Sequence, residues 1–480
     1  MKNAIFIVAA VLLPTLLGGQ SLSSFLQSGI VLGTERERHF SMRIKALGRD
    51  FSGLLPDQIT DLYRNPAFFH RTKTPILFGE LVRQPAGLET KARFSYTKTY
   101  GVLLRGNYEN SALRSGGPLD QPGFDTDKDR AFHGEAQFSL GFPLSERLSS
   151  GASYTYGTNE FDYLRSDGTS SSYYTDLTSR DNNNTDRAHV ARFGLIWDKA
   201  EGKSWDAVAT VERFSADGTY LYQANKSQTF NPQSSNRQYS LQDARVRATN
   251  LRLALRFLNA SQPEKTFAAQ FSAGVAFFSE NDQDYSSSYS QSVRMSSFDT
   301  SETITTASLD ENWAADGFGF QLQSGAGWSW HRNNFLFAVA ALGNFRRVSY
   351  DDRAQRETVY TQTLRTSKNT YTWNDRRQTP QLRNDYTVSY YGLAAPVGIE
   401  YNPTKGLQLR AGWKIQFLGR TNERSSSERS WRSSYNYLDT STVTFGLGYQ
   451  IFDQLRADLV NFGNLSEPRN WNLAIIYSFQ

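Results

Sequence analysis

The 480-residue chain contains no cysteine, which excludes disulfide bonds, thiolate metal sites and cysteine nucleophiles. Histidine is scarce, and none of the histidines belongs to an HExxH zinc motif or a GxSxG serine-nucleophile motif. The histidines are His39, His70, His133, His189 and His331. We therefore expect a protein that is not an enzyme and that holds neither a metal ion nor an organic cofactor.

Long apolar runs are missing beyond the N-terminus, and their absence excludes membrane-spanning helices there. The one such run, residues 4–17, follows Lys2 and precedes small residues, which is the layout of an export signal. We predict a signal peptide over residues 1–20, with cleavage near Gly19 or Ser23. An uncleaved anchor helix is the alternative, although the run is short for a hydrocarbon core of about 30 Å.

A concentrated basic surface is also lacking. The net charge is only +5 and the lysines and arginines are dispersed, so a nucleic-acid partner is not expected. Aromatic residues are abundant, at 14% of the chain, although the mean hydropathy is −0.55. A transmembrane β-barrel needs both features, because its outer band is apolar and aromatic while its lumen and loops are polar.

Apolar and polar residues alternate with a period of two from about residue 92 onward, and the first such segment predicts one strand at 92–108. In residues 442–451, Val443, Phe445, Leu447 and Tyr449 alternate with small and polar residues. Successive side chains of a strand point to opposite faces, so one face of this segment suits lipid. A soluble β-sandwich also alternates, but the many rings at the segment ends favour the interfacial girdles of a barrel.

The alternating segments are joined by short and long links in turn, as periplasmic turns and extracellular loops alternate in outer-membrane barrels. We therefore predict an all-β protein, a transmembrane antiparallel barrel of about fourteen strands in the outer membrane. A strand at residues 74–83 would raise the number to sixteen. The links expected to be long loops are 109–130, 158–186, 214–246, 280–318, 348–385 and 418–440.

The last segment carries one unbroken apolar row that resembles the C-terminal signal of outer-membrane barrels. We expect the barrel-assembly machinery to recognise it, although Gln480 follows the final aromatic residue. The row consists of Trp471, Leu473, Ile475, Tyr477 and Phe479.

Charged residues of both signs occupy the face expected to line the lumen. Such charges are tolerated in a wet or mutually paired interior, where they either lock a plug in place or form a selectivity lining. They are Glu135, Arg192, Glu212, Arg252, Arg256, Glu400, Arg410 and Lys414. Outer-membrane lipid and lipopolysaccharide are expected partners, and one long link offers arginines for their phosphates, unless these are ordinary solvated charges. Those arginines are Arg420, Arg424, Arg429 and Arg432.

Residues 21–90, between the signal peptide and the barrel at 91–480, do not alternate. Pro56 and Asp57 suit the start of a short helix, and Asn65-Pro66 ends it, because proline disfavours helical geometry in the preceding residue. A barrel of about fourteen strands leaves a lumen too wide for side chains alone to fill. We therefore predict that residues 21–90 form an N-terminal plug.

The segment Asp57–Phe69, D-Q-I-T-D-L-Y-R-N-P-A-F-F, resembles FadL-type long-chain fatty-acid transporters, in which a short helix leads into Asn-Pro-Ala. The resemblance implies an N-terminal plug within a fourteen-stranded barrel and passive uptake of small hydrophobic molecules. The glycine-rich stretch of that family is poorly matched at 43–48, and its ligand-site residues have no counterpart. The residues that the resemblance places in the plug are Asp57, Asp61, Asn65, Pro66 and Ala67.

Two other functions are compatible with the same pattern. A porin for polar solutes would need an open lumen. A structural or secretion-linked barrel would use its long links as a platform for partners.

Overall fold

The computed structural model describes residues 41–48, 51–72, 76–84, 87–96, 100–111, 123–170, 174–228, 233–262, 264–295, 300–426, 430–462 and 471–479. The predicted signal peptide, Arg429 and Gln480 lie outside these ranges. Among the described residues, no helix is long and apolar enough to cross a membrane.

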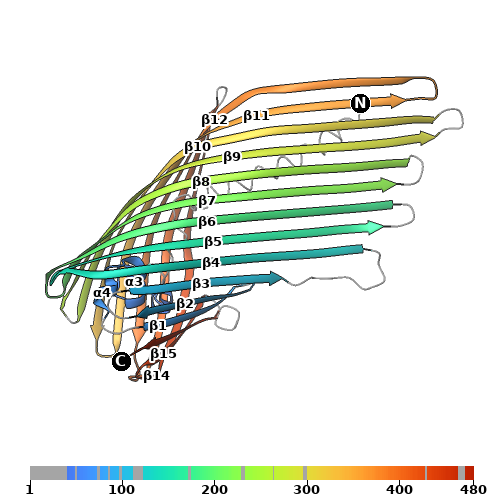
Figure 1. The fold of residues 1–480 in the computed structure, drawn as a ribbon. Coiled ribbons are helices and arrows are strands. Elements are labelled where there is room, and N and C mark those ends of the chain that lie inside the picture. The colour runs from blue at the N-terminus through green and yellow to red at the C-terminus, as the bar shows by residue number, and fades with distance from the viewer. Residues whose placement is uncertain are drawn as a thin grey trace.

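The described strands form one antiparallel barrel, which confirms the predicted fold class (Figure 1). Strands that are consecutive in sequence pair with each other, and β1 also pairs with β16 from Ile76–Ser478 to Val82–Asn472, so the strand order closes on itself. The strands are β1 (Ile76–Gln84), β2 (Gly87–Tyr96), β3 (Tyr100–Ser111), β4 (Gly123–Ser145), β5 (Leu148–Ser170), β6 (Tyr174–Ala200), β7 (Lys203–Gln228), β8 (Gln233–Gln262), β9 (Lys265–Met295), β10 (Thr300–Arg332), β11 (Phe335–Arg365), β12 (Thr370–Tyr401), β13 (Leu407–Ser426), β14 (Ser430–Phe452), β15 (Leu455–Phe462) and β16 (Trp471–Ser478).

The described residues form sixteen strands, which is the larger of the two numbers that the sequence allows. β1 occupies the optional segment at 74–83, and the region expected to be one strand at 92–108 is shared by β2 and β3. A period-two pattern does not mark where a strand reverses direction, so a hairpin can look like one long strand. The predicted boundary between plug and barrel, after residue 90, therefore falls inside β2, and the barrel begins at Ile76.

The predicted long loops are wrong for most of their length, because the chain continues there as paired strands. Strands β5 to β12 are between 23 and 33 residues long, whereas about 9–11 residues suffice to cross a bilayer. The extra length projects as one long wall beyond the rest of the barrel (Figure 1). Polar residues predominate on both of its faces, so hydropathy alternates little there although the backbone pairing continues.

The outer face of the barrel carries an apolar band, as expected for a lipid-facing surface. On β8, Leu251, Leu253 and Leu255 are exposed, whereas Asn250 and Arg256, which flank this run on the alternate face, are buried. On β16, Leu473, Ile475 and Tyr477 alternate with Asn472 and Ala474, which are buried. Phe479 follows the end of this strand, and its ring lies 4.8 Å from that of Tyr477.

Candidate functional site

Among the residues that the structure describes, three short helices precede the barrel: α2 (Met42–Ala46), α3 (Gln58–Arg64) and α4 (Phe68–Arg71). The first two have N-caps, because Ile44 donates its backbone N–H to Ser41 Oγ at 3.2 Å and Thr60 donates to Asp57 Oδ1 at 2.9 Å. Helices this short are not stable in isolation, so they depend on packing against the barrel.

Apolar side chains of this N-terminal segment contact strands on different sides of the barrel. One cluster joins it to β9 and β11, and its members are Ile44, Leu47, Phe51, Leu54, Leu55, Ala268, Leu336, Ala338 and Ala340. The other joins it to β1, β15 and β16, and its members are Met42, Ala46, Ile59, Tyr63, Phe78, Val460 and Ala474. These wall residues lie on the face opposite to the apolar band, so the helices lie against the inner wall, near the ends of the strands (Figure 1).

The Asn65-Pro66-Ala67 turn lies on a row of glycines in the wall. Gly141, Gly151 and Gly194 are cross-strand partners on β4, β5 and β6. A Cβ atom on Gly151 would overlap the backbone of Pro66 and Ala67, and one on Gly194 would overlap Asn65 Oδ1.

Asn65 is fully buried in this contact and its side chain is hydrogen-bonded on both sides. Its Nδ2 donates to the Leu195 carbonyl oxygen at 3.3 Å, and its Oδ1 accepts from the Ala67 N–H at 3.0 Å. The glycine row and this turn are therefore complementary, which gives the Asn-Pro-Ala sequence a structural reason. A second contact of this kind places Leu47 on Gly398 and Gly412, which are partners on β12 and β13.

A buried ion network joins α3 to β7 and β8. Arg256, which is only 1% exposed, donates to Asp61 Oδ1 at 2.7 Å and to Asp206 Oδ2 at 2.5 Å. Arg64 of α3 donates to the same Asp206 at 2.5 Å. Two carboxylates thus face two guanidinium groups, and the network is neutral as a whole.

A second ion network joins α2 to β12, β13 and β15. Glu400 Oε2 accepts from Arg43 Nε of α2 and from Arg410 Nε, both at 2.9 Å. Arg410, whose side chain is fully buried, also donates to Asp458 Oδ1 at 2.8 Å. At α4, Arg71 forms a third connection, to Asp198 at 2.7 Å.

The structure places all eight residues expected to line the lumen on the inner face. Arg256, Glu400 and Arg410 belong to the two networks, whereas Glu212 accepts from Asn250 at 3.2 Å and Arg252 donates to Gln323 at 3.2 Å. Glu135, Arg192 and Lys414 share the face of Gly141, Gly194 and Gly412 respectively, because they lie an even number of residues away on β4, β6 and β13.

Sequence reasoning missed the partners of these charges. They are Arg43, Arg64, Asp206 and Asp458. Asp206 and Asp458 stand at alternate positions that match the predicted lumen face of their strands, so the period-two pattern could have predicted that they face the lumen. Arg420 and Arg424, which were expected to face outward and meet lipopolysaccharide, face the lumen instead. Their guanidinium groups lie over the inner-face rings of Tyr390 and Tyr386, at 5.4 and 5.3 Å.

Farther from the helices, one row of the inner wall is made up of aromatic and small residues. Each residue is the cross-strand partner of the next, and the row crosses β6 to β12. We call the four rings of this row, Phe214, Phe278, Tyr350 and Tyr386, the inner aromatic row. The full sequence of partners is Ala188, Phe214, Ala248, Phe278, Gly317, Tyr350 and Tyr386.

Three rings of this row, Phe278, Tyr350 and Tyr386, contact each other across the strands. Tyr350 and Tyr386 stack at 4.9 Å with an interplanar angle of 11°, and Phe278 meets Tyr350 edge-on at 6.3 Å. The ring of Phe278 lies over Gly317, where a Cβ atom would overlap it. The glycine therefore makes room for the ring.

Apolar residues extend the row on both sides, so that an apolar patch forms on the inner wall. Its further members are Ala216, Val246, Ala276, Ala315 and Val348. The lumen face of a water-filled barrel is polar, so this patch is unusual for a porin. Ligand sites for apolar molecules are instead lined mainly by apolar and aromatic side chains.

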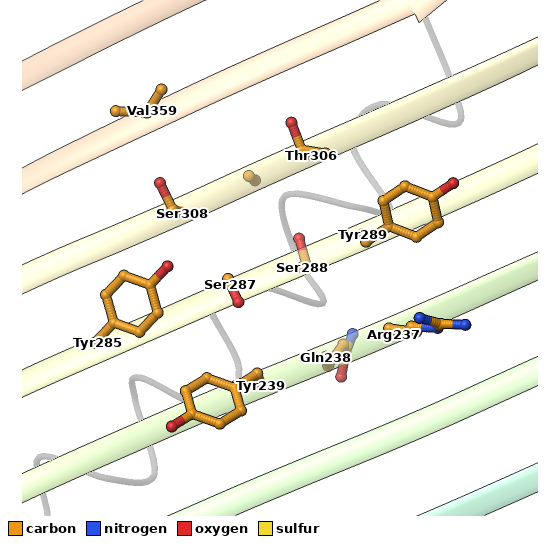
Figure 2. A pocket seen from close by; sticks show the side chains of 11 residues that line it. Arg237, Gln238, Tyr239, Tyr285, Ser287, Ser288, Tyr289, Thr306, Ser308 and Val359 are labelled. Carbon is orange, nitrogen blue, oxygen red and sulfur yellow. The ribbon is translucent and has the colours of Figure 1, made fainter.

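A separate groove lies on the outer face of the extended wall. Figure 2 shows Tyr239 of β8 and Tyr285 and Tyr289 of β9 around Ser287. The rings of Tyr239 and Tyr285 stand edge-on at 6.2 Å. Tyr285, Ser287 and Tyr289 share the outward face of Phe277 on β9, so the groove is not part of the inner site.

No family model matches the chain, and no curated protein is similar to it. Solved structures to which it is similar include the toluene transporter TbuX of Ralstonia pickettii, at 12% identity over 92% of this chain and 99% of that chain, with a TM-score of 0.36. The toluene transporter TodX of Pseudomonas putida matches at 12% identity over 92% and 98%, with a TM-score of 0.36. A Pseudomonas aeruginosa FadL homologue matches at 12% identity over 92% and 98%, with a TM-score of 0.34.

TM-scores of this size carry neither a ligand nor a residue's role over to this chain. The strand number also departs from the fourteen that the resemblance implied, since sixteen strands are described.

Proposed function

We propose that the protein is an outer-membrane barrel for the passive uptake of small hydrophobic molecules, with its N-terminal segment acting as a plug in the lumen. The observation that carries this proposal is the inner aromatic row with its surrounding apolar patch. Four large rings on the inner wall offer a hydrophobic ligand an apolar surface that a lining of polar residues alone does not.

The outer apolar band, the export signal and the C-terminal strand support the membrane location. The plug is supported by the way the N-terminal helices are held. Two ion networks and two glycine contacts fix them to strands on different sides of the wall. A ligand that enters from the side of the long strands would meet the aromatic row before it met these helices.

The expected affinity suits transport rather than storage. A small aromatic ligand that buries about 150 Å² of apolar surface against the row would gain roughly 4 kcal/mol at about 25 cal/mol per Å². Binding of this size is weak and readily reversible. Conduction requires that a ligand binds well enough to enter and weakly enough to leave.

The proposal is tested with a pair of variants on adjacent residues of β9. Phe278→Ala removes a ring of the inner aromatic row, whereas Phe277→Ala removes an exposed ring of the outer face. Whole cells are given N-phenyl-1-naphthylamine, and its initial rate of uptake is followed by fluorescence with and without de-energising the cells. We expect Phe278→Ala to lower the protein-dependent rate about tenfold, the equivalent of about 1.4 kcal/mol, while Phe277→Ala leaves it unchanged.

Three results would count against the proposal. Equal rates for the two variants would remove the role of the aromatic row. Loss of uptake on de-energising the cells would contradict passive uptake. A large and steady conductance of the wild-type protein in planar bilayers would favour a porin and contradict the plug.

A further inference from the structure

Three arginines lie together on the outer wall, on neighbouring strands. Arg187 of β6 and Arg247 of β8 are the cross-strand partners of Ser215 on β7, and Arg213 lies two residues from that serine on the same face. Diagonal neighbours of this kind are about 7–8 Å apart. We call Arg187, Arg213 and Arg247 the arginine triad.

The triad lies at the edge of the outer apolar band. Arg213 comes two residues after Val211, an exposed member of that band, and its cross-strand partner on β6 is His189. His189 Nδ1 is 2.6 Å from the hydroxyl of the exposed Tyr154, and its ring centroid is 5.2 Å from that of Tyr156. Tyrosines gather at membrane–water interfaces, so the triad lies at the height of lipid headgroups.

This edge faces away from the N-terminal helices. On β6, Gly194 contacts the Asn65 turn, and Arg187 lies farther along the strand in the direction of the long extensions. If the short turns face the periplasm, as in other outer-membrane barrels, the triad belongs to the outer leaflet.

All three arginines are exposed, and within the described part of the chain none forms an ion pair. Asp217 lies two residues beyond Ser215 on the same face, opposite Arg245 of β8, and none of the described ion pairs joins it to the triad. Two positive charges about 8 Å apart repel by roughly 0.5 kcal/mol in water. An anion bound between the three strands would offset this repulsion.

The triad is a local feature and not part of a uniform basic ring. The same row of cross-strand partners continues through Ser279 to Asp316, Asp351 and Asp385 on β10 to β12. There the row consists of aspartates, and Asp351 is paired with Arg383 at 2.7 Å and with Arg353 at 3.4 Å. Within this row, the arginines lie on β6 and β8 and the aspartates on β10 to β12.

We propose that the arginine triad binds the phosphate groups of an outer-leaflet lipid headgroup. The planar guanidinium group donates two parallel hydrogen bonds to phosphate, which makes arginine the residue best suited to this ligand. Because the three arginines lie on paired strands, their spacing is fixed by the sheet, and no loop has to become ordered when the phosphate binds. The acyl chains of the lipid would lie along the apolar band that begins at Val211 and Leu251.

This lipid site lies directly behind the inner aromatic row. Arg213 is followed in sequence by Phe214 of that row, and Arg187 and Arg247 are followed by Ala188 and Ala248, the cross-strand partners of Phe214. A bound headgroup and a ligand in the lumen would therefore contact opposite faces of the same three strand segments. The lipid site does not depend on the proposed uptake function, and it requires only the membrane orientation.

The test compares the triple variant Arg187→Gln/Arg213→Gln/Arg247→Gln with the wild-type full-length protein in non-ionic detergent. The matched control is Arg365→Gln/Arg376→Gln/Arg377→Gln, which removes three arginines that are 57%, 67% and 80% exposed elsewhere on the wall. The probes are fluorescent lipid A with both phosphates, the same lipid without phosphates, and inorganic phosphate as a competitor.

We expect the triad variant to bind lipid A at least tenfold more weakly, and the control to stay within twofold of wild type. Unchanged binding by the triad variant would overturn the proposal, as would equal wild-type binding of lipid A without phosphates. Displacement of lipid A by an equimolar amount of inorganic phosphate would identify a free-anion site instead of a lipid site. If the triple variant does not fold, Arg213→Lys keeps the charge but loses the planar fork, and it should still weaken binding measurably.

Discussion

Replacement of Arg256 by methionine tests how the N-terminal segment is held against the wall. Arg256 is buried and is bonded to Asp61 of α3 and Asp206 of β7, and Arg64 is the only other cation in this network. With Arg256 the network is neutral, and without it one buried negative charge has no counterion. Removing one partner of a buried ion pair costs about 3–5 kcal/mol.

The lost free energy should weaken the packing of the N-terminal helices against the wall more than it weakens the barrel, because the strands of the barrel remain paired. A cost of about 4 kcal/mol corresponds to nearly a thousandfold increase in the population with the helices detached. Trypsin cleavage within residues 41–72 measures this population, because the rate of cleavage follows the equilibrium fraction of the opened state when reclosing is fast. Conductance in planar bilayers provides a second reading, and it should rise in the variant.

A charge-balanced variant serves as the control. Arg256→Met combined with Asp61→Asn leaves Asp206 paired with Arg64, so the network is neutral again and much of the resistance to trypsin should return. The reasoning is refuted if Arg256→Met is cleaved within twofold of the wild-type rate, or if the double variant is cleaved faster than the single one.

Two further predictions concern glycines of the inner wall. Gly194→Val should displace the Asn65 turn, because the new side chain overlaps Asn65 Oδ1, and trypsin should then cleave residues 41–72 faster. Gly343→Ala is the control: its Cβ meets nothing nearer than 3.4 Å, so this variant should behave as wild type in the same assay. Gly317→Leu should drive the Phe278 ring out of the inner aromatic row and lower N-phenyl-1-naphthylamine uptake about as much as Phe278→Ala, and unchanged uptake would contradict the role given to the row.

The alternation of residue types determined much of the fold. In β8, the leucines at 251, 253 and 255 and the polar residues between them fix which face meets lipid, because neighbouring side chains of a strand must point in opposite directions. The same local rule placed Arg256, Glu400 and Arg410 on the lumen side. It failed where both faces are polar, as in the extended parts of β9 and β10, since hydropathy then carries no period.

The residues of the candidate site are brought together by the cross-strand register, and the register cannot be predicted from a local sequence pattern. Phe214, Phe278, Tyr350 and Tyr386 are far apart in sequence and become one row only through the pairing of β7 to β12. Phe214 opens a segment that looked like a loop, and Tyr350 lies within another. Their meeting depends on the lengths of the hairpins between them.

The sequence by itself determined the barrel, its lipid-facing surface, its final strand and the short helix that leads into Asn65-Pro66-Ala67. Only the tertiary structure decided that this turn lies on Gly141, Gly151 and Gly194, and that Asp61 meets Arg256. The physical reason is the range of the interactions. Strand faces and helix ends follow from residues a few positions apart, whereas these contacts join α3 and the turn after it to strands more than seventy residues away.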